Sequence, residues 1–175
     1  GIRDMLVEQK DVFYYVTLMN ENYAQPDLPA GAEQDVLRGC RHFGRYGPAD
    51  GKPGTLLGSG AILGEAIKAA ELLAARGVSC DVYSVTSWSE LAREGQAAGT
   101  AVPFITRQLQ AGSGPVIAAT DYVVAWQRLV AAYIDAPFTA LGTDGFGRSD
   151  TRAQLRRFFE VDRHHIVVTA LSRLA

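Results

Sequence analysis

The sequence predicts a three-layer α/β domain around a mixed, mainly parallel sheet, and three observations support this prediction. Apolar, β-prone runs alternate with stretches whose apolar residues recur at helical spacing. The strand-like run at residues 78–85 follows a strand-like and then a helix-like run, and such a β-α-β unit implies parallel pairing. A glycine-rich loop at residues 142–151 stands between a late strand and a late helix. Such loops, at the carboxyl ends of strands, are where open α/β sheets meet ligands and partners.

The N-terminal part of the chain combines a β-prone run with a linker. The first ten residues look like the end of a helix, and residues 12–18 are mostly apolar, as expected of a buried strand. A stretch rich in asparagine and proline then ends at Gly31 and indicates a linker. Asn20, Glu21 and Asn22 directly follow the predicted strand. They either form the turn that ends it or approach a neighbouring domain.

The remaining elements are assigned from periodicity and from residues that favour helix starts and ends. Strands are expected over residues 39–46, at a sheet edge, and over 55–58, 78–85, 115–119 and 138–142. Helices are expected over residues 32–38, 62–73, 102–109 and 122–133, and from residues 88, 155 and 163 onward. Turn-rich loops are expected over residues 45–54 and 96–101. The side chains predicted to cap helix N-termini are Ser59, Thr86 or Ser87, Asp121, Ser149 or Asp150, and Asp162.

The composition argues against several classes of function. A chain of 175 residues, 47% of them hydrophobic, favours one domain with its own core. The net charge of −2 argues against a nucleic-acid partner, and we interpret the cluster of Arg152, Arg156 and Arg157 as the solvated face of one helix. No apolar run is long enough to span a bilayer and no signal peptide opens the sequence, so no membrane partner is expected. Cys40 and Cys80 indicate reduced core cysteines in a cytoplasmic protein.

The run from Gly58 to Gly64 follows a strand and opens a helix, so a dinucleotide site has to be considered. The fingerprint requires its third glycine three positions after the second, where this chain has Leu63. Asp81 has roughly the spacing of the ribose-binding acid, but it opens its strand and does not close it. The dinucleotide signature is therefore incomplete.

No metal or nucleophilic site is predicted either. Cys40 and His42 share a strand face, but nothing nearby supplies two further ligands at a suitable spacing. The chain has no Gly-x-Ser-x-Gly elbow, and Ser149 stands beside Asp150 without a local base. We therefore assign no catalytic, cofactor-binding or metal-binding residue to this chain.

Two interpretations of the glycine-rich loop remain open. Asp144 and Arg148 either form a local ion pair that rigidifies the loop, or they face a neighbouring domain or subunit. In the second case Phe146, Ser149 and Asp150 belong to the same contact surface.

The order of several motifs points to a known family. Gly142-Thr-Asp-Gly-Phe-Gly-Arg-Ser-Asp-Thr-Arg152 resembles the C-terminal domain of the homodimeric, thiamine-diphosphate-dependent pyruvate dehydrogenase component, a member of the transketolase superfamily. Further matching stretches follow in the same order: Asp11-Val-Phe-Tyr-Tyr15, Asn20-Glu-Asn-Tyr23, Asp81-Val-Tyr-Ser-Val-Thr-Ser87, Glu90-Leu-Ala-Arg-Glu-Gly-Gln96, Thr120-Asp-Tyr122 and Phe159-Glu-Val-Asp162. Together they cover nearly the whole chain, which implies a piece of a larger enzyme with a Rossmann-like fold.

The resemblance also implies a domain division and a cofactor. Residues 1–30 would be the tail of a preceding pyrimidine-binding domain plus linker, and residues 31–175 a transketolase C-terminal-like domain. Family members hold thiamine diphosphate and Mg²⁺ between two other domains, so no cofactor is expected on this chain. Thr143 stands where the first glycine of the family's Gly-Asp-Gly metal motif should be, so that motif is not carried over.

The function implied by the resemblance is that of a non-catalytic domain supporting dimer and domain assembly in the oxidative decarboxylation of pyruvate, which links glycolysis to acetyl-CoA. The expected partners are the other domains of its own chain, a homodimer partner and the dihydrolipoamide acetyltransferase core. The alternatives are a module that docks the acyltransferase core or an effector, and a stand-alone nucleotide-binding domain. Residues 97–101 are shorter than the family's stretch at this place, which leaves the 2-oxo acid of the parent open. The residues expected at an interface are Asn20, Glu21, Asn22, Asp144, Phe146, Arg148, Ser149 and Asp150.

Overall fold

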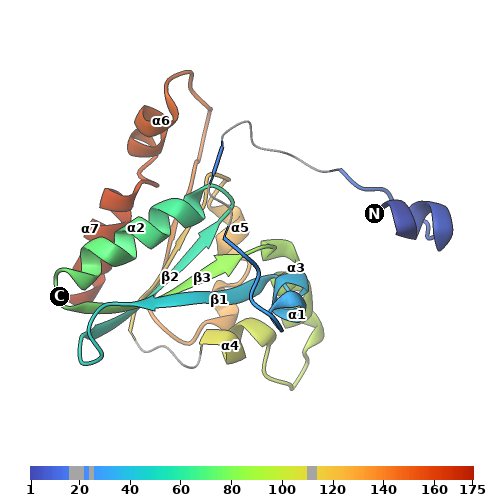
Figure 1. Ribbon diagram of the computed structural model, residues 1–175, viewed down its shortest axis with the longest axis horizontal. Helices are drawn as coiled ribbons and strands as arrows, with labels where there is room; N and C mark the ends of the chain where they lie inside the picture. Colours follow the sequence, from blue (N-terminus) through green and yellow to red (C-terminus); the bar gives the residue numbers. More distant parts are fainter. Residues whose placement is uncertain (16–21, 24–25, 110–113) are drawn as a thin grey trace.

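The sheet confirms the predicted architecture. The computed structural model describes residues 1–15, 22–23, 26–109 and 114–175. Its strands are β1 (Cys40–Tyr46), β2 (Lys52–Ser59), β3 (Val78–Val85), β4 (Val116–Ala119) and β5 (Phe138–Leu141). They form one sheet in the order β1-β3-β2-β4-β5 (Figure 1). The edge strand β1 runs antiparallel to β3, and every other pair is parallel. The mixed, mainly parallel sheet and the edge position of residues 39–46 are thus confirmed.

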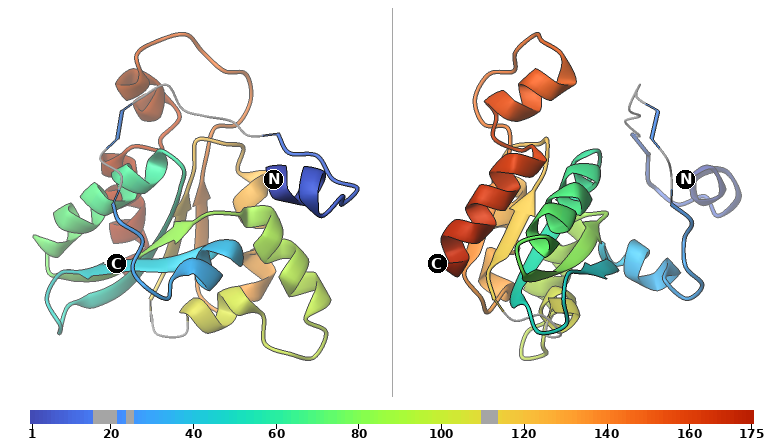
Figure 2. Two further views of the ribbon diagram at one scale, coloured as in Figure 1. Left: turned by 45° about the vertical axis from the view of Figure 1, so that its right-hand side comes forward. Right: turned by 60° about the vertical axis from the view of Figure 1, so that its left-hand side comes forward.

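Helices cover both faces of this sheet, which gives three layers (Figure 2). One face carries α2 (Ile62–Ala74) and α7 (Arg163–Leu174). The other carries α3 (Trp88–Ala97), α4 (Phe104–Leu109), α5 (Ala125–Arg128) and the 3₁₀-helix η2 (Ala131–Tyr133). The short helix α1 (Glu33–Leu37) precedes β1, and a π-helical turn η1 (Arg3–Val7) lies near the N-terminus. Helix α6 (Arg152–Phe158) stands beyond the end of the sheet, above α7 in Figure 1.

The core divides into two clusters because successive side chains of a strand point to opposite faces. Leu56 and Val82 belong to the cluster under α2 and α7, whereas their neighbours Leu57 and Tyr83 belong to the cluster under α3 and α4. The β2–α2–β3 unit is parallel, as predicted. The buried residues of α2 include every predicted position, namely Ile62, Ala66, Ala69, Ala70 and Leu73.

The predicted strand at residues 12–18 is wrong over the part that the structure describes. Residues 12–15 have no regular secondary structure, and Phe13 and Tyr15 are 88% and 86% exposed. Within the described residues no strand pairs with them, and an extended segment needs a neighbour to satisfy its backbone groups. Residues 16–18 lie outside the described part of the chain.

Strand β2 and helix α3 are longer than predicted, at the expense of the loops at residues 45–54 and 96–101. β2 begins at Lys52 and pairs with β3 along its whole length. It includes Pro53 because its pairing with β4 starts only at Thr55, so no β4 partner requires the N–H that proline lacks. Helix α3 continues to Ala97, two residues into the predicted loop.

Two of the predicted helix caps are confirmed. The Ser87 hydroxyl accepts a hydrogen bond from the Glu90 N–H at 3.1 Å at the start of α3. The Asp162 carboxylate accepts from the N–H groups of His164 and His165, at 3.0 and 2.9 Å, at the start of α7. Both caps satisfy backbone donors that a helix leaves unpaired in its first turn.

The other predicted caps are wrong. Ser59 is the last residue of β2, and its hydroxyl donates to Thr120 Oγ1 at 2.7 Å, so it caps no helix. The segment expected to form one helix over residues 122–133 divides into α5 and η2, and neither receives a side-chain cap from Asp121. Helix α6 is capped by Thr151, which follows both predicted candidates, Ser149 and Asp150.

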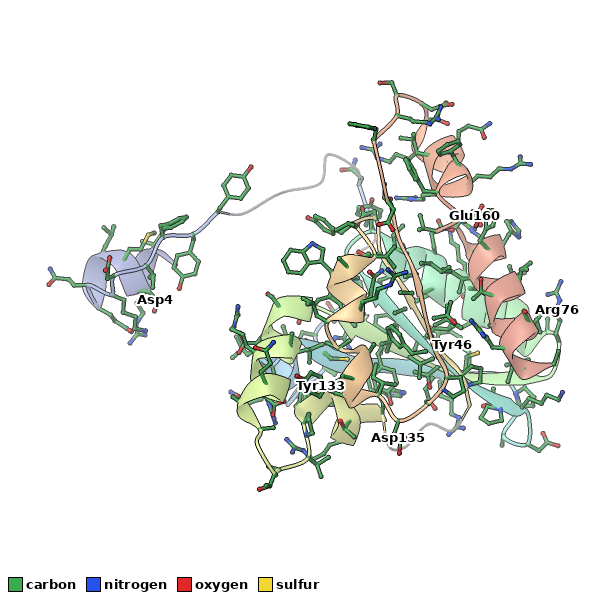
Figure 3. The ribbon with its side chains drawn as sticks, turned by 180° about the vertical axis from the view of Figure 1, so that it is seen from behind. Asp4, Tyr46, Arg76, Tyr133, Asp135 and Glu160 are labelled. Carbon is green, nitrogen blue, oxygen red and sulfur yellow. The ribbon has the colours of Figure 1, made fainter. Side chains whose placement is uncertain are left out.

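Helix α6 ends in a left-handed residue that is not glycine. Glu160 has a φ of 58° and lies between α6 and α7 (Figure 3). Its N–H donates to the Arg157 carbonyl at 3.2 Å, and the Val161 N–H donates to the Arg156 carbonyl at 2.9 Å. These are the two hydrogen bonds of a Schellman motif, in which glycine is favoured because a Cβ atom strains the left-handed backbone.

We expect Glu160→Gly to raise the free energy of unfolding by about 0.5–1 kcal/mol, because it removes that strain. The melting temperature should rise by roughly 2 °C. Urea denaturation measures the free energy of unfolding, and thermal melts measure the melting temperature. The matched control is Gly77→Ala, at a φ of 75° after α2, where an added Cβ meets no heavy atom within 4 Å. It should lose about 1 kcal/mol through backbone strain alone. A Glu160→Gly variant less stable than the parent would refute this account.

Candidate functional site

The glycine-rich loop leaves β5 at Leu141 and is anchored at its first half to the segment after β4. The Thr143 N–H donates to the Tyr122 carbonyl at 2.8 Å. One residue later, Asp144 Oδ1 accepts from the Val124 N–H at 2.9 Å. The Asp144 carboxylate therefore satisfies a backbone donor at the start of α5, where Asp121 was the predicted cap.

The local ion pair between Asp144 and Arg148, one of the two interpretations of the loop, is not formed. The Arg148 guanidinium carbon lies 4.2 Å from the centroid of the Phe158 ring, an arrangement in which the ring attracts the cation. Arg148 therefore stacks against α6, whereas Asp144 is bound to the α5 side of the loop.

The outer half of the loop exposes a large apolar side chain. Residues 144–150 are all exposed, and Phe146 is 97% exposed. The predicted interface residues Asp144, Phe146, Arg148, Ser149 and Asp150 thus share one exposed segment. Asn22 is exposed as well, and Asn20 and Glu21 lie outside the described residues.

The neighbouring segment around α5 buries a polar side chain and exposes apolar ones. Gln127 is fully buried, and its Nε2 donates to the Leu141 carbonyl at 2.7 Å. Four apolar side chains of the same segment are 42–55% exposed, and we call them the α5 apolar face: Tyr122, Val123, Trp126 and Leu129. Exposed large apolar groups beside a buried polar one are informative, because isolated domains rarely leave such groups uncovered. The arrangement is typical of a surface that packs against another domain or subunit.

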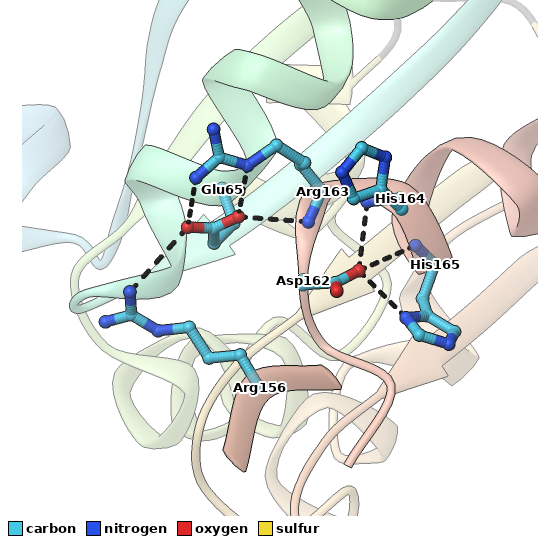
Figure 4. Close-up of polar contacts among 6 residues, drawn as sticks. All are labelled: Glu65, Arg156, Asp162, Arg163, His164 and His165. Carbon is cyan, nitrogen blue, oxygen red and sulfur yellow. Dashed lines mark hydrogen bonds and ion pairs between the residues drawn. The ribbon is translucent and has the colours of Figure 1, made fainter. Parts of the chain in front are cut away.

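A buried ion cluster connects α2 with the junction of α6 and α7 (Figure 4). Glu65 is 6% exposed, and its carboxylate accepts from Arg163 Nε at 2.8 Å, Arg163 Nη2 at 3.0 Å and the Arg163 backbone N–H at 3.0 Å. Arg156 Nη1 lies 3.6 Å from Glu65 Oε1. The interpretation of the α6 arginines as a solvated face is therefore wrong for Arg156, whose side chain is only 18% exposed.

The cluster sets the pKa of its carboxylate. Burial raises the pKa of Glu65, but the hydrogen bonds and charge of Arg163, with the charge of Arg156, outweigh burial and hold that pKa below its ordinary value. Burial likewise raises the pKa of Asp162, and hydrogen bonds from His165 and His164 more than offset it. Both carboxylates thus add stability above the ordinary carboxylate pKa, and this stability is lost as the pH falls through the lowered values.

Two cavities adjoin the loop and α6. The larger one, of about 360 Å³, is lined by Arg148, Ser149, Asp150, Gln154, Leu155 and Phe158. The second, of about 240 Å³, is lined by Asp121, Thr143, Gly147, Arg148, Arg152, Leu155, Arg156, Phe159 and Val161. We call the second one the switch-point cavity, because Asp121 and Thr143 follow the carboxyl ends of β4 and β5.

The turn after β2 does not fit a dinucleotide. A Cβ atom on Gly58 would lie 2.8 Å from the Leu63 Cα, so close packing of α2 against β2 explains this glycine. Asp81 lies in the middle of β3, where its Oδ1 is 3.0 Å from His42 Nε2, and it is not available to a ribose. The sequence signature for dinucleotide binding is incomplete, and the geometry of Gly58 and Asp81 does not suit a dinucleotide either.

The remaining predicted candidates have structural roles. Cys40 and Cys80 are free and buried, and burial raises the pKa of each thiol to about 12. Among the described residues, no group of three or more His, Cys, Asp or Glu side chains is arranged to hold a metal ion. None of the helices in that part of the chain is long and apolar enough to cross a bilayer.

The fold and the loop together define an open α/β domain whose candidate site lies at the carboxyl ends of its parallel strands. A family model described as the transketolase-like TK C-terminal domain matches residues 45–162. The chain belongs to this family, as the motifs in its sequence implied.

The chain is also similar over its full length to larger proteins. The pyruvate dehydrogenase E1 component of Cupriavidus necator is 45% identical over 187 residues, which cover 100% of this chain and 21% of that protein. The E1 component of Escherichia coli K12 is 43% identical over 188 residues, with the same coverage. The chain thus spans about a fifth of the length of these relatives. Both alignments are longer than the 175-residue chain, so each relative has residues without a counterpart here.

Solved structures support the fold. Transketolase from Leishmania mexicana matches with a TM-score of 0.56 and 22% identity, over 83% of this chain and 19% of that one. A transketolase from Pichia stipitis matches with a TM-score of 0.59 and 14% identity, over 85% of this chain and 20% of that one. At these identities the similarity shows the fold alone.

Two features of the site were missed from the sequence. Glu65 is a charged residue on the buried face of α2, next to Ala66, and this position was the only local signal of an ion cluster. The α5 apolar face has helical spacing, which normally indicates a buried face, so its exposure could not be read from the pattern.

We expect Glu65→Gln to lower the free energy of unfolding by about 2 kcal/mol at pH 7, because hydrogen bonds to a charged group are lost inside the domain. The melting temperature should fall by roughly 4–8 °C. The difference from the parent should narrow below about pH 4.3, where Glu65 becomes protonated in the unfolded parent. Glu71→Gln, on the same helix but outside the cluster, is the control. Denaturation curves from pH 3 to 8 test this, and a pH-independent difference would contradict it.

Proposed function

We propose that this chain is the non-catalytic C-terminal domain of a pyruvate dehydrogenase E1-type enzyme that acts in the oxidative decarboxylation of pyruvate. The observation that carries the proposal is 42–45% identity to E1 components along the whole chain, at about a fifth of their length. In this proposal residues 1–30 are the tail of a preceding pyrimidine-binding domain plus linker, and residues 31–175 are the C-terminal domain. The protein is cytoplasmic, and its partners include neither nucleic acid nor membrane.

The domain contributes contact surface to a homodimer. The loop side chains Asp144, Phe146, Arg148, Ser149 and Asp150 are exposed, and the α5 apolar face lies next to the anchored half of the same loop. Covering Phe146 and this face in an assembled enzyme would remove the apolar surface that the isolated domain leaves exposed. The exposed residues 12–15 support a further contact of the same kind, toward the preceding domain. Asn20, Glu21 and Asn22 are proposed to approach that domain as well.

The parent enzyme would use thiamine diphosphate and Mg²⁺, which supply the carbanion chemistry of decarboxylation when bound. The described residues of this chain do not fit the metal ion. Asp144, the only acidic residue in the sequence that resembles the family's metal motif, is bound to the Val124 N–H. The described residues offer no metal-binding cluster. In this proposal the chain contributes support to the domains that bind the cofactor.

Docking of the dihydrolipoamide acetyltransferase core is the alternative use of the same exposed surface. The two uses are distinguished by which interaction a substitution in this surface weakens. Docking predicts weaker binding to the acyltransferase core, and dimer support predicts weaker association of two E1 chains. The stand-alone nucleotide-binding alternative is disfavoured by the close approach of Gly58 to Leu63 and by the position of Asp81.

We expect Phe146→Ser in the full-length parent to raise the dimer dissociation constant at least tenfold, because a buried aromatic anchor is lost from the interface. Sedimentation velocity measures the dissociation constant, and pyruvate-dependent reduction of an artificial electron acceptor measures activity. Activity should fall at low enzyme concentration and recover at high concentration, since the chemistry lies in other domains.

The control for that experiment is Val168→Ser. Val168 is 65% exposed on α7 and lies outside both the loop and the α5 apolar face. It should leave the dimer and the activity unchanged. An unchanged dimer with Phe146→Ser would refute the interface, and a selective loss of binding to the acyltransferase core would favour the docking alternative.

A further inference from the structure

Arg41 is a buried cation on the edge strand of the sheet. It lies on β1, is 8% exposed, and pairs across the ladder with Ser84. Charged side chains are rarely buried to this degree unless an opposite charge pairs with them. The carboxylate of Glu65 shows the usual arrangement, since Arg163 and Arg156 lie beside it.

Arg41 has no such partner among the residues that the structure describes. Its Nη1 donates to the His42 carbonyl at 3.4 Å, which exceeds the roughly 2.7–3.2 Å usual for such a bond. Its guanidinium carbon lies 5.0 Å from the centroid of the Phe43 ring. A guanidinium carries N–H donors on every nitrogen, and one distant carbonyl and one ring leave most of them unused. No carboxylate in the described part of the chain forms an ion pair with this group.

The unused donors of Arg41 are accessible from outside. Gln127 Oε1 is the only fully buried side-chain nitrogen or oxygen without a hydrogen-bond partner in the part of the chain that the structure describes. The free guanidinium nitrogens of Arg41 therefore keep some contact with solvent, although the residue as a whole is mostly covered. So narrow an opening admits only a compact group. A carboxylate fits this description, and it accepts two parallel N–H bonds from a guanidinium.

The position of Arg41 in the fold favours a partner that reaches the edge of the sheet. Cys40 belongs to the cluster under α3 and α4, so the next side chain points to the opposite face, where Phe43 packs on the cluster under α2. Among the described strands none lies beyond β1. The pairing with Ser84 places Arg41 near the carboxyl end of β3, and open α/β sheets meet ligands and partners at this end.

The surroundings favour a partner that is a protein. Leu37, three residues before β1, is 70% exposed, and residues 26–31 are exposed as well. Exposed apolar groups next to an unpaired, mostly buried charge are typical of a surface that another domain covers. The chain spans about a fifth of the length of its E1 relatives, so most of the proposed parent enzyme lies outside it.

We propose that Arg41 binds an Asp or Glu carboxylate of a neighbouring domain or subunit in the assembled parent enzyme. The inference rests on the proposed function, because the carboxylate comes from outside this chain. It adds a second contact, at the β1 edge, whose residues belong neither to the glycine-rich loop nor to the α5 apolar face. It needs no cofactor and involves no covalent step.

The test is Arg41→Met, made both in this chain alone and in the full-length parent. In this chain alone the melting temperature should stay unchanged or rise by a few degrees, because an apolar side chain of similar length replaces an unpaired charge. In the full-length parent the melting temperature should fall by roughly 3 °C or more, because a buried carboxylate loses its partner. Thermal melts of both forms measure this difference in sign.

The dimer dissociation constant identifies the source of the carboxylate. If it belongs to the partner subunit, Arg41→Met should raise this constant at least tenfold in sedimentation velocity. If it belongs to another domain of the same polypeptide, the melting temperature falls while the dissociation constant stays unchanged.

The matched control is Arg38→Met. Arg38 has its partners inside the domain: its Nη2 lies 3.2 Å from Glu94 Oε1, and its guanidinium carbon lies 3.8 Å from the centroid of the Phe104 ring. This variant should lower the melting temperature of this chain and of the full-length parent alike.

Three outcomes would overturn the proposal. The first is an equal fall in melting temperature in both forms of Arg41→Met, which would assign the residue a role within the domain. The second is no loss of stability or of dimerisation in the full-length parent. The third is that inorganic phosphate stabilises this chain saturably, and only when Arg41 is present, without such a loss in the parent. That result would assign the site to a free anion.

The two contacts fail independently. If Phe146→Ser leaves the dimer unchanged, the proposed loop contact is refuted, and a selective loss of stability with Arg41→Met still supports the contact at β1. If Arg41→Met has no effect on the parent, the result for Phe146 stands.

Discussion

The buried carboxylate of Glu65 is the constraint on which the geometry at the carboxyl end of the sheet depends. A charge that is 6% exposed has to be compensated, because an unpaired buried carboxylate is strongly unfavourable. Arg163, at the start of α7, and Arg156, near the end of α6, provide the compensation. Since these arginines lie on either side of the left-handed turn at Glu160, one side chain of α2 fixes how α6 is placed relative to α7. The far wall of the switch-point cavity is part of α6 and is fixed with it.

Much of the fold could be predicted because its signals are local. Ser87 and Asp162 cap helices that begin at the next residue, so the pattern and its effect lie within one turn. The prediction for Ser59 failed because its hydroxyl is bound to Thr120 and accepts from Trp88 Nε1, two partners from other parts of the fold. The same competition explains α5, whose first N–H groups are satisfied in part by Asp144 from a distant loop. A local pattern does not encode such partners.

The candidate site was also predictable only where its signals lie in the local sequence. Its glycines located the loop, and the order of the motifs identified the family, since both are properties of the sequence alone. The reversed polarity of α5, with Gln127 buried and Trp126 42% exposed, follows from a tertiary hydrogen bond to the Leu141 carbonyl. Helical spacing predicts that one face of a helix is apolar. It does not predict whether that face packs against the core of this chain or against the surface of another chain.

Thr143 connects the proposed dimer contact with the cavity behind the loop. Its N–H holds the loop to Tyr122, a member of the α5 apolar face, and the residue also lines the switch-point cavity. A contact on the apolar face therefore acts on the same short segment, between β5 and Asp144, that forms part of the cavity wall. If the loop takes different positions in the free and assembled states, assembly and any ligand of the cavity shift each other's affinity by the same factor, because coupling between two binding equilibria is reciprocal. If the loop does not move, no coupling arises, since a ligand shifts only an equilibrium between states that it binds differently.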